Sequence, residues 1–365
     1  MPSQTMLCTI VLAAVIGVFP AAYAFESDTF HGGNLRDGRI SRGAPKTLTG
    51  ISWQFDAGTE ITTAPLVAGN NIFIGTRGGS LYALDADSGE LQWSFETGAQ
   101  ILATPAIDKN IIYFGDSAGY VRAADIKSGH VFWTFKGDQS FTAPVMVAND
   151  TVFTGTSKGA LVALNQENGG LRWTFPVTGA VYAAPSLYRE NIYIGDTRGL
   201  FHVVRLADGK TGWIFKMKDA IYSAAAHFKD QLFVGSHDWN VYCLRSIALN
   251  ECWVYETSGA VASTPAVDRK KVYAGSHDGF LYALDRKTGA LQWRFETGDW
   301  VNGSPVLSGS LVLFGSHDGY LYGLDAESGT NIWQFDAGSA VKQSPAVHKG
   351  KIFVASENGT LFAIY

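Results

Sequence analysis

This sequence has few charged residues and little net charge. Charged residues make up 17% of the 365 residues, and 28 Lys and Arg stand against 33 Asp and Glu, for a formal net charge of −5. A protein that neutralises nucleic-acid phosphates needs a clustered basic face, which this even mixture does not supply. The hydrophobic content of 46% also excludes a disordered chain. We therefore expect a folded protein that binds no nucleic acid.

Signatures of common enzyme and metal sites are also missing. The chain contains no Walker, Rossmann, zinc-site or hydrolase motif. Long stretches with apolar residues at helical spacing are absent too, which excludes a helical solenoid. From motifs alone we predict no catalytic residue and no metal site.

A long apolar run occurs at the N-terminus. Residues 6–18 are almost entirely apolar, and no charged residue precedes Glu26. This run is shorter than the roughly 20 residues of a membrane span, and Ala22-Tyr23-Ala24 then offers a small-x-small cleavage pattern. We predict a signal peptide over residues 1–24 and a periplasmic or secreted mature chain with no transmembrane span. A buried N-terminal helix is the alternative, because residues 1–5 lack the usual Lys or Arg.

Tryptophan is the residue that organises the rest of the chain. Eight tryptophans recur at intervals of 40 residues: Trp53, Trp93, Trp133, Trp173, Trp213, Trp253, Trp293 and Trp333. Only Trp239 and Trp300 fall outside this series. In the first full repeat, apolar runs and turn signals predict strands over 61–67, 72–75, 81–84 and 91–95. Four antiparallel strands in about 40 residues are the size of one propeller blade.

The repeat count predicts how the ring closes. Seven complete repeats run over residues 61–335, and the eighth, 341–365, has only three strands. The missing fourth strand is present at residues 51–55, around Trp53. Its insertion into the last blade removes an exposed sheet edge. We predict an all-β fold with a lead-in over 25–50 and one eight-bladed β-propeller over 51–365. We expect all eight regular tryptophans to dock against the neighbouring blade.

The repeat resembles a known motif. The pattern A-x-D-x-x-[ST]-G-x-x-x-W is complete in three repeats, for example Ala283-Asp285-Thr288-Gly289-Trp293. It is similar to the tryptophan-docking motif of the pyrroloquinoline quinone (PQQ) repeat. The run Phe30-His31-Gly32-Gly33-Asn34 also looks like the lead-in of such proteins.

This resemblance implies two classes of function. Quinoprotein alcohol dehydrogenases of the superfamily bind PQQ and calcium in the mouth of the propeller. BamB-type members lack a cofactor and act as binding scaffolds in outer-membrane protein assembly. This chain has no Cys-Cys dipeptide and no room for inserts between blades, which favours the second class, although it lacks the lipidated cysteine of BamB. We expect a monomeric scaffold for a protein or peptide of the cell envelope, without cofactor. A compact PQQ- and calcium-dependent dehydrogenase is the alternative.

Equivalent residues at the propeller mouth are the candidate binding residues. The position three before the proline of most inner strands varies in size and charge, whereas its neighbours are small or aliphatic. The third repeat is interpreted as shifted by one residue, which puts Phe141 at this position. Such variation is typical of a binding surface, or of solvent exposure alone. With Trp300, which is outside the regular series, the predicted binding residues are Phe141, Tyr182, Tyr222, Trp300, Asn302 and Lys342.

A Ser-His-Asp sequence recurs in three consecutive repeats, at 236–238, 276–278 and 316–318. Three adjacent residues of one turn cannot align as a catalytic triad. Equivalent loops are expected to stand about 10 Å apart, too far to share a zinc ion. A hairpin turn is the preferred interpretation, and a histidine-lined patch that charges near pH ~6.5 is the alternative.

Two cysteines follow the predicted signal peptide. Cys243 and Cys252 lie on the two legs of one predicted hairpin, and counting from both ends places them opposite each other. An exported chain with two thiols usually oxidises them. We predict a Cys243–Cys252 disulfide, with two free buried thiols as the alternative.

Overall fold

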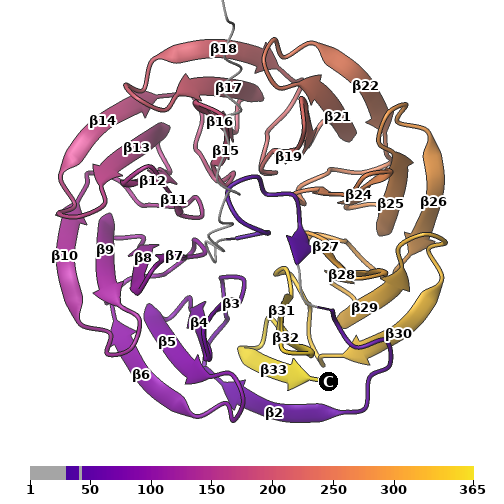
Figure 1. Ribbon diagram of the computed structural model, residues 1–365, viewed down its shortest axis with the longest axis horizontal. Coiled ribbons are helices and arrows are strands. Elements are labelled where there is room, and N and C mark those ends of the chain that lie inside the picture. The colour runs from indigo at the N-terminus through magenta and orange to yellow at the C-terminus, as the bar shows by residue number, and fades with distance from the viewer. Residues whose placement is uncertain (1–29, 41–42) are drawn as a thin grey trace, which may run out of the picture.

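The described residues form eight four-stranded antiparallel blades around a central axis (Figure 1). The computed structural model describes residues 30–40 and 43–365. The predicted signal peptide, 1–24, and residues 25–29 lie outside this part of the chain. Blade one contains β3–β6, the blades follow in chain order, and blade eight contains β31–β33 with β2. The predicted fold class is confirmed.

Each blade runs from a short inner strand to a long outer strand. The innermost strands are β3 (Leu66–Ala68), β7 (Ala106–Asp108), β11 (Met146–Ala148), β15 (Ser186–Tyr188), β19 (Ala226–Phe228), β23 (Ala266–Val267), β27 (Val306–Ser308) and β31 (Ala346–His348). The second strands are β4 (Asn71–Gly75), β8 (Ile111–Gly115), β12 (Thr151–Gly155), β16 (Asn191–Gly195), β20 (Gln231–Gly235), β24 (Lys271–Gly275), β28 (Leu311–Gly315) and β32 (Lys351–Ala355). The third strands are β5 (Ser80–Asp85), β9 (Tyr120–Asp125), β13 (Ala160–Asn165), β17 (Leu200–Arg205), β21 (Asn240–Arg245), β25 (Phe280–Asp285), β29 (Tyr320–Asp325) and β33 (Thr360–Ile364). The outer strands are β6 (Leu91–Glu96), β10 (Val131–Lys136), β14 (Leu171–Pro176), β18 (Thr211–Lys216), β22 (Glu251–Glu256), β26 (Leu291–Glu296), β30 (Asn331–Asp336) and β2 (Ile51–Asp56).

The ring closes by the pairing of the two ends of the propeller. Strand β2 pairs antiparallel with β33, with Trp53 opposite Ala363 and Gln54 opposite Phe362. The predicted closure is therefore confirmed. In residues 30–40 and 43–365, no helix is long and apolar enough to cross a membrane.

The inner strands are shorter than the sequence predicts. The predicted first strand, 61–67, is observed only as β3, and residues 61–65 form the connection from the preceding blade. Pro65 has no backbone N–H with which to extend the ladder. The N–H of Ala64 instead donates to Thr104 Oγ1 of blade two, at 3.1 Å. The residues before each inner strand thus link neighbouring blades.

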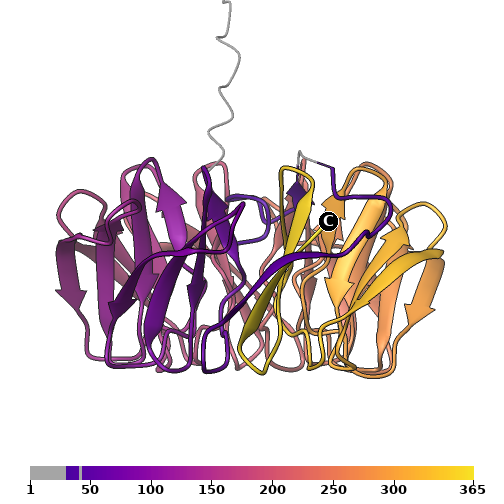
Figure 2. The ribbon, with the colours of Figure 1, turned by 90° about the horizontal axis from the view of Figure 1, so that it is seen from below.

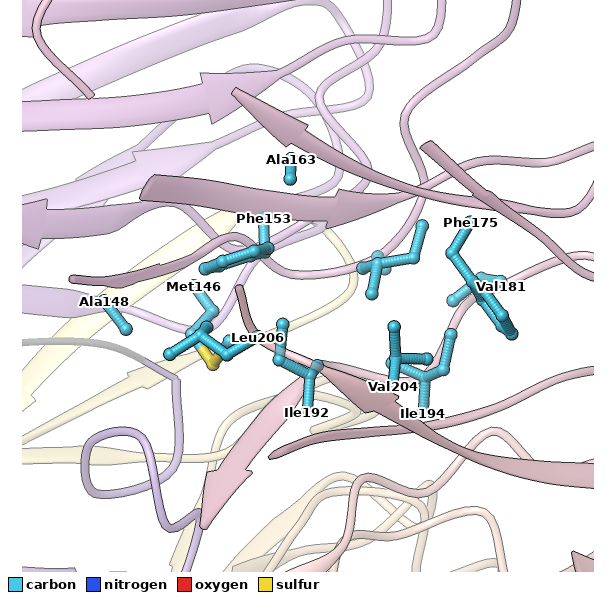
Figure 3. Close-up of a cluster of buried hydrophobic side chains, with 12 residues drawn as sticks. Met146, Ala148, Phe153, Ala163, Phe175, Val181, Ile192, Ile194, Val204 and Leu206 are labelled. Carbon is cyan, nitrogen blue, oxygen red and sulfur yellow. The ribbon is translucent and has the colours of Figure 1, made fainter. Parts of the chain in front are cut away.

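Hydrophobic cores lie between neighbouring blades. One cluster joins Met146, Phe153 and Leu161 of blade three to Ile192 and Val204 of blade four (Figure 3). Each blade therefore buries both faces, one against each neighbour. This packing explains why the second and third strands are almost continuously apolar rather than alternating.

Seven of the eight regular tryptophans dock on the next blade. Trp253 is typical: its Nε1 donates to Arg286 O at 2.9 Å, and its ring covers Gly289. A Cβ at Gly289 would lie 2.7 Å from the indole, which explains the glycine of the motif. Trp333 donates to Pro45 O, because the lead-in replaces the missing turn of blade eight.

Trp213 is the exception and corrects the expectation that all eight dock. Its side chain is 58% exposed. The position of the docking glycine in the next blade is occupied by Leu249, which is buried in the core cluster of blades four and five. A leucine side chain fills the space that an indole would need, so Trp213 remains in solvent.

The lead-in crosses the central channel. In Figure 1 its indigo segment runs through the middle of the ring, and in Figure 2 it lies in the upper part of the channel. Backbone carbonyls of Asn34, Leu35, Asp37 and Gly38 accept hydrogen bonds from inner-strand N–H groups of blades four to seven, at 2.8–3.0 Å. Strand β1 (Arg39–Ile40) then pairs parallel with β27. The lead-in therefore closes one end of the channel.

The prediction that Cys243 and Cys252 lie directly opposite each other is wrong. Cys243 is opposite Trp253, because a β-bulge between Trp253 and Glu251 leaves Cys252 without a directly opposite partner. Both cysteines are free thiols in the structure. Burial raises the pKa of the Cys243 thiol, and a hydrogen bond with the Cys252 thiol raises it further.

Candidate functional site

A cavity of about 410 Å³ lies on the axis at the mouth of the propeller. Each blade contributes one residue at equivalent positions, spaced by 40 residues, from the connection that leads into its inner strand. We call these residues the mouth ring: Thr62, Leu102, Thr142, Tyr182, Tyr222, Ala262, Asn302 and Lys342. Phe30 of the lead-in also lines the cavity.

Phe141 does not belong to the mouth ring. Its side chain is only 1% exposed and packs in the core cluster of blades two and three. The residue equivalent to Tyr182 is Thr142, so the third repeat is not shifted. Phe141 is instead equivalent to the buried Val181, so its aromatic ring fills a core position of the repeat and is not available for binding.

The two sides of the cavity differ in chemistry. The apolar wall consists of Pro144, Tyr182, Ala184 and Tyr222, from the connections that enter blades three to five. The polar wall consists of Asn302, Ser304, Lys342, Gln343 and Ser344, from the connections that enter blades seven and eight. These blades lie across the ring from one another (Figure 1). The cavity therefore suits an occupant with one apolar side and one hydrogen-bonding side.

Aromatic rings form a continuous arc along the mouth. The Tyr182 and Tyr222 ring centroids lie 5.6 Å apart, and His237 lies 4.5 Å from Tyr222. His277 follows at 5.5 Å from His237 and stacks on Trp300 at 4.5 Å, with 6° between the planes. His317 lies 5.5 Å beyond Trp300. Tyr182, Tyr222 and Trp300 are 40%, 36% and 47% exposed, so their faces are available for contact.

The histidine side chains of two Ser-His-Asp turns lie near each other. The ring centroids of His237 and His277 are 5.5 Å apart. In the described part of the chain, no three His, Cys, Asp or Glu side chains gather to hold a metal ion. The aspartates are structural: each accepts a hydrogen bond at 2.7 Å from a tyrosine hydroxyl four residues later, as Asp278 does from Tyr282.

Burial favours the neutral form of three side chains of the arc, His237, His317 and Tyr222. It lowers the pKa of His237, with a further contribution from the charge of His277. It also lowers the pKa of His317, with the charge of Lys342 acting in the same direction. Burial raises the pKa of Tyr222, so its phenol is neutral as well.

The polar wall has one paired cation and one unpaired hydroxyl. Lys342 Nζ forms an ion pair with Glu357 and lies 3.7 Å from Glu60 Oε1. Its charge is therefore balanced inside the protein. Ser344 is 5% exposed, and its Oγ has no hydrogen-bond partner among the described residues. Asn302 Oδ1 lies 3.2 Å from His277 Nε2.

Two contributions to the site are missed by the sequence. Phe30 belongs to a recognised lead-in motif, but only the fold shows that the lead-in enters the channel. Behind Phe30 lies the fully buried Arg36, whose guanidinium donates to Pro185 O, Val145 O and Phe30 O. Burial lowers the pKa of Arg36 to about 9. The second, Trp239, lies in the turn that also contains His237 of the cavity lining, and its signal in the sequence is a tryptophan outside the 40-residue series.

Fold, repeat and mouth together define a PQQ-repeat, BamB-like eight-bladed β-propeller. The chain belongs to the family described as the β-propeller of beta-alanine-activating enzyme, whose model matches residues 46–271. A second model, described as outer membrane protein assembly factor BamB, matches residues 278–365. No curated protein sequence matches the chain.

Solved structures share the fold at low sequence identity. BamB from Moraxella catarrhalis aligns with a TM-score of 0.76 at 19% identity, covering 87% of this chain and 99% of that one. The computationally designed Ika8 protein has a TM-score of 0.77 at 18% identity, with 85% and 97% covered. Quinohemoprotein alcohol dehydrogenase from Comamonas testosteroni has a TM-score of 0.79 at 13% identity, with 93% and 80% covered. At these identities the likeness extends to the fold alone.

Proposed function

We propose that this protein is an exported, non-catalytic binding propeller whose mouth holds a protein or peptide of the cell envelope. The observation that carries the proposal is the mouth itself. Exposed aromatic rings, such as that of Tyr222, and neutral amide and hydroxyl groups, such as that of Asn302, line the same cavity. Protein-binding loops use the same combination, because rigid aromatic rings supply contact area and small polar groups supply hydrogen bonds.

The similarity to BamB supports the same proposal. One family model and one solved structure that resemble this chain are both named BamB. The predicted signal peptide would place the chain in the periplasm or outside the cell. A role in envelope or outer-membrane protein assembly, as a monomeric scaffold, is consistent with both features.

The residues at the mouth do not fit a dehydrogenase that uses PQQ and calcium. Calcium takes six to eight oxygen ligands, several of them usually carboxylates, and alcohol oxidation needs a base for the hydroxyl proton. Within the described residues, no carboxylate lines the cavity. Glu60 and Glu357 lie beside it, but they pair with Arg77 and Lys342. The described cavity lining therefore supplies neither the carboxylate ligands nor a carboxylate base for this chemistry.

The test removes two rings of the apolar wall. The double variant Tyr182→Ala, Tyr222→Ala should no longer cross-link, in envelope extracts, to the partner that the wild type captures. Each of these anchors contributes about 2 kcal/mol or more to the binding free energy. The melting temperature should stay almost unchanged, because both side chains are more than one third exposed. Phe132→Ala removes a ring that is also exposed, at 53%, from the outer strand β10, and it serves as the control.

Two results would contradict the proposal. Retention of every partner by the double variant would exclude the mouth as the binding face. Stoichiometric PQQ uptake with dye-linked alcohol oxidation, followed by visible absorption, would favour the dehydrogenase.

A further inference from the structure

Trp239 occupies a backbone position that the repeat otherwise reserves for glycine. It ends the turn between the second and third strands of blade five, at φ 72°. The equivalent residue in the other seven blades is a glycine with φ between 76° and 95°: Gly79, Gly119, Gly159, Gly199, Gly279, Gly319 and Gly359. A left-handed backbone is unfavourable for a bulky side chain. The tryptophan is therefore held in a conformation that costs stability.

Among the described residues, the Trp239 indole makes no hydrogen bond and no ring-to-ring contact. The turn's hydrogen bonds involve only the backbone of Trp239: its N–H donates to Ser236 O, and its carbonyl accepts from Thr257. The glycine turns make the same backbone bonds, as Gly79 does with Thr76 and Thr97. The Trp239 side chain is 52% exposed. A strained residue that gains little from packing points to a role outside folding.

Trp239 belongs to the same face as the cavity. It lies two residues after His237, whose ring contacts Tyr222 of the apolar wall at 4.5 Å. Trp239 thus adds an exposed indole to the turn that presents His237 to the cavity. A ligand small enough to fit inside the cavity alone would leave this indole unused, so the occupant must continue over the rim.

The chemistry of the cavity defines the rest of the occupant. Lys342, the one charged side chain of its lining in the described part of the chain, is balanced by Glu357 and Glu60. A charged occupant would lose water without gaining a free counter-ion. The buried, unpartnered Ser344 Oγ can exchange a hydrogen bond with an amide group.

We propose that the mouth binds an uncharged peptide segment of a partner protein, with Trp239 as its rim anchor. An apolar side chain of the segment packs on the apolar wall, and its backbone amides meet Asn302, Gln343 and Ser344. The segment then leaves the cavity across Trp239. This inference rests on the proposed function and names the chemistry of its partner.

The decisive variant is Trp239→Gly, which restores the residue of the other seven blades. Random 12-residue peptides displayed on phage are selected on the wild-type protein, and their binding is then measured by calorimetry. We expect Trp239→Gly to weaken the selected peptides by about 30-fold or more. Its melting temperature should equal or exceed that of the wild type, because the strain is relieved.

Controls test whether the loss of binding is specific to Trp239 or follows from the loss of any exposed tryptophan. Trp213→Ala removes an indole of similar exposure from the outer strand β18, and it should leave peptide affinity unchanged. A Lys or Asp placed at the centre of a selected peptide should abolish binding. Ser344→Ala should weaken binding without affecting the melting temperature.

Several outcomes would overturn the inference. The Trp239→Gly variant would contradict it by binding the selected peptides with wild-type affinity or by melting at a lower temperature than the wild type. The selection would contradict it by yielding only charged peptides or none. Displacement of bound peptide by neutral oligosaccharides would also contradict it. If Tyr182→Ala with Tyr222→Ala abolishes peptide binding while Trp239→Gly does not, only the anchor is wrong. If neither variant affects peptide binding, the proposed function fails as well.

Discussion

At the scale of single residues, a glycine and a tryptophan 36 residues earlier act as one docking unit. The glycine has a positive φ, and the tryptophan of the preceding blade covers it, as Trp253 covers Gly289. Replacing the glycine breaks the unit, because Leu249 leaves Trp213 exposed. A regular tryptophan that faces a turn of the next blade thus docks where the turn has glycine, whereas Trp333 docks on the lead-in at Pro45 instead.

This dependence predicts a large difference between two chemically identical substitutions. Trp253→Ala should lower the free energy of unfolding by about 3–5 kcal/mol, because a buried ring is lost and a cavity remains. Trp213→Ala should change it by less than about 0.5 kcal/mol, as surface substitutions usually do. Guanidinium-induced unfolding measures both. Equal losses would mean that docking is not what the regular tryptophans contribute.

The same scale shows where prediction from sequence ends. The mouth position was identified correctly in seven blades, because proline marks the start of most inner strands. In the third blade a phenylalanine stands at the preceding core position, and aromatic character alone does not reveal whether Phe141 is buried or exposed. The Cys243–Cys252 register failed because a β-bulge adds one residue to the outer strand.

At the scale of elements, strands with a strong apolar pattern were predictable and the lead-in was not. The second to fourth strands of a blade have apolar runs bounded by turns, and their predicted ranges agree with β4, β5 and β6 to within about two residues. The lead-in has no such pattern. It is held by backbone hydrogen bonds to blades four to seven and by the side chain of Asn34, whose Nδ2 donates to Val147 O of blade three at 3.1 Å. These bonds depend on the finished ring.

The fit of the lead-in can be tested with two glycines of equal backbone angle. Gly38 and Gly58 have φ 70° and 71°, but a Cβ at Gly38 would lie 2.7 Å from Ala266 Cβ, whereas Gly58 has open space. Alanine at either position should cost about 1–2 kcal/mol for the left-handed backbone. Gly38→Ala should cost about 1–3 kcal/mol more, because it overpacks the channel. Equal values in chemical denaturation would show that the lead-in is loosely seated.

At the scale of the whole molecule, the two ends of the central channel differ, because one is filled and the other is open. The lead-in fills one end with buried polar groups, and the mouth leaves a cavity at the other. The contrast between polar and apolar walls arises because the ring places blades four and eight opposite each other. Tyr182 and Lys342 are 160 residues apart, which is four repeats of 40 residues and half of an eight-bladed ring, so the repeat itself predicts that they face each other across the mouth.

The pH dependence of stability is also a property of the whole molecule, because it sums the protons bound by all titratable groups. His227 is buried against Tyr188 and Tyr193, and burial lowers its pKa to about 3. Burial also lowers the pKa of His31, although hydrogen bonds to the carbonyls of Arg36 and Pro305 oppose this. Both imidazoles are neutral in the fold and become protonated in the unfolded chain below about pH 6.5. The unfolded state then binds more protons, so the free energy of unfolding falls as the pH falls.

We therefore expect the unfolding free energy to be constant from about pH 8 to pH 7 and to decrease below about pH 6.5. His227 alone should contribute about 1 kcal/mol of this decrease per pH unit, down to about pH 4. His227→Gln removes this titration, keeps a partner for Ser186 Oγ, and should flatten the profile. His130→Gln, at an exposed position, should leave the wild-type slope unchanged. Denaturant unfolding at about pH 7, pH 6 and pH 5 measures all three slopes. If the unfolding free energies of the wild type and of His227→Gln depend on pH in the same way, another group is responsible for the slope. Burial would then not hold His227 neutral.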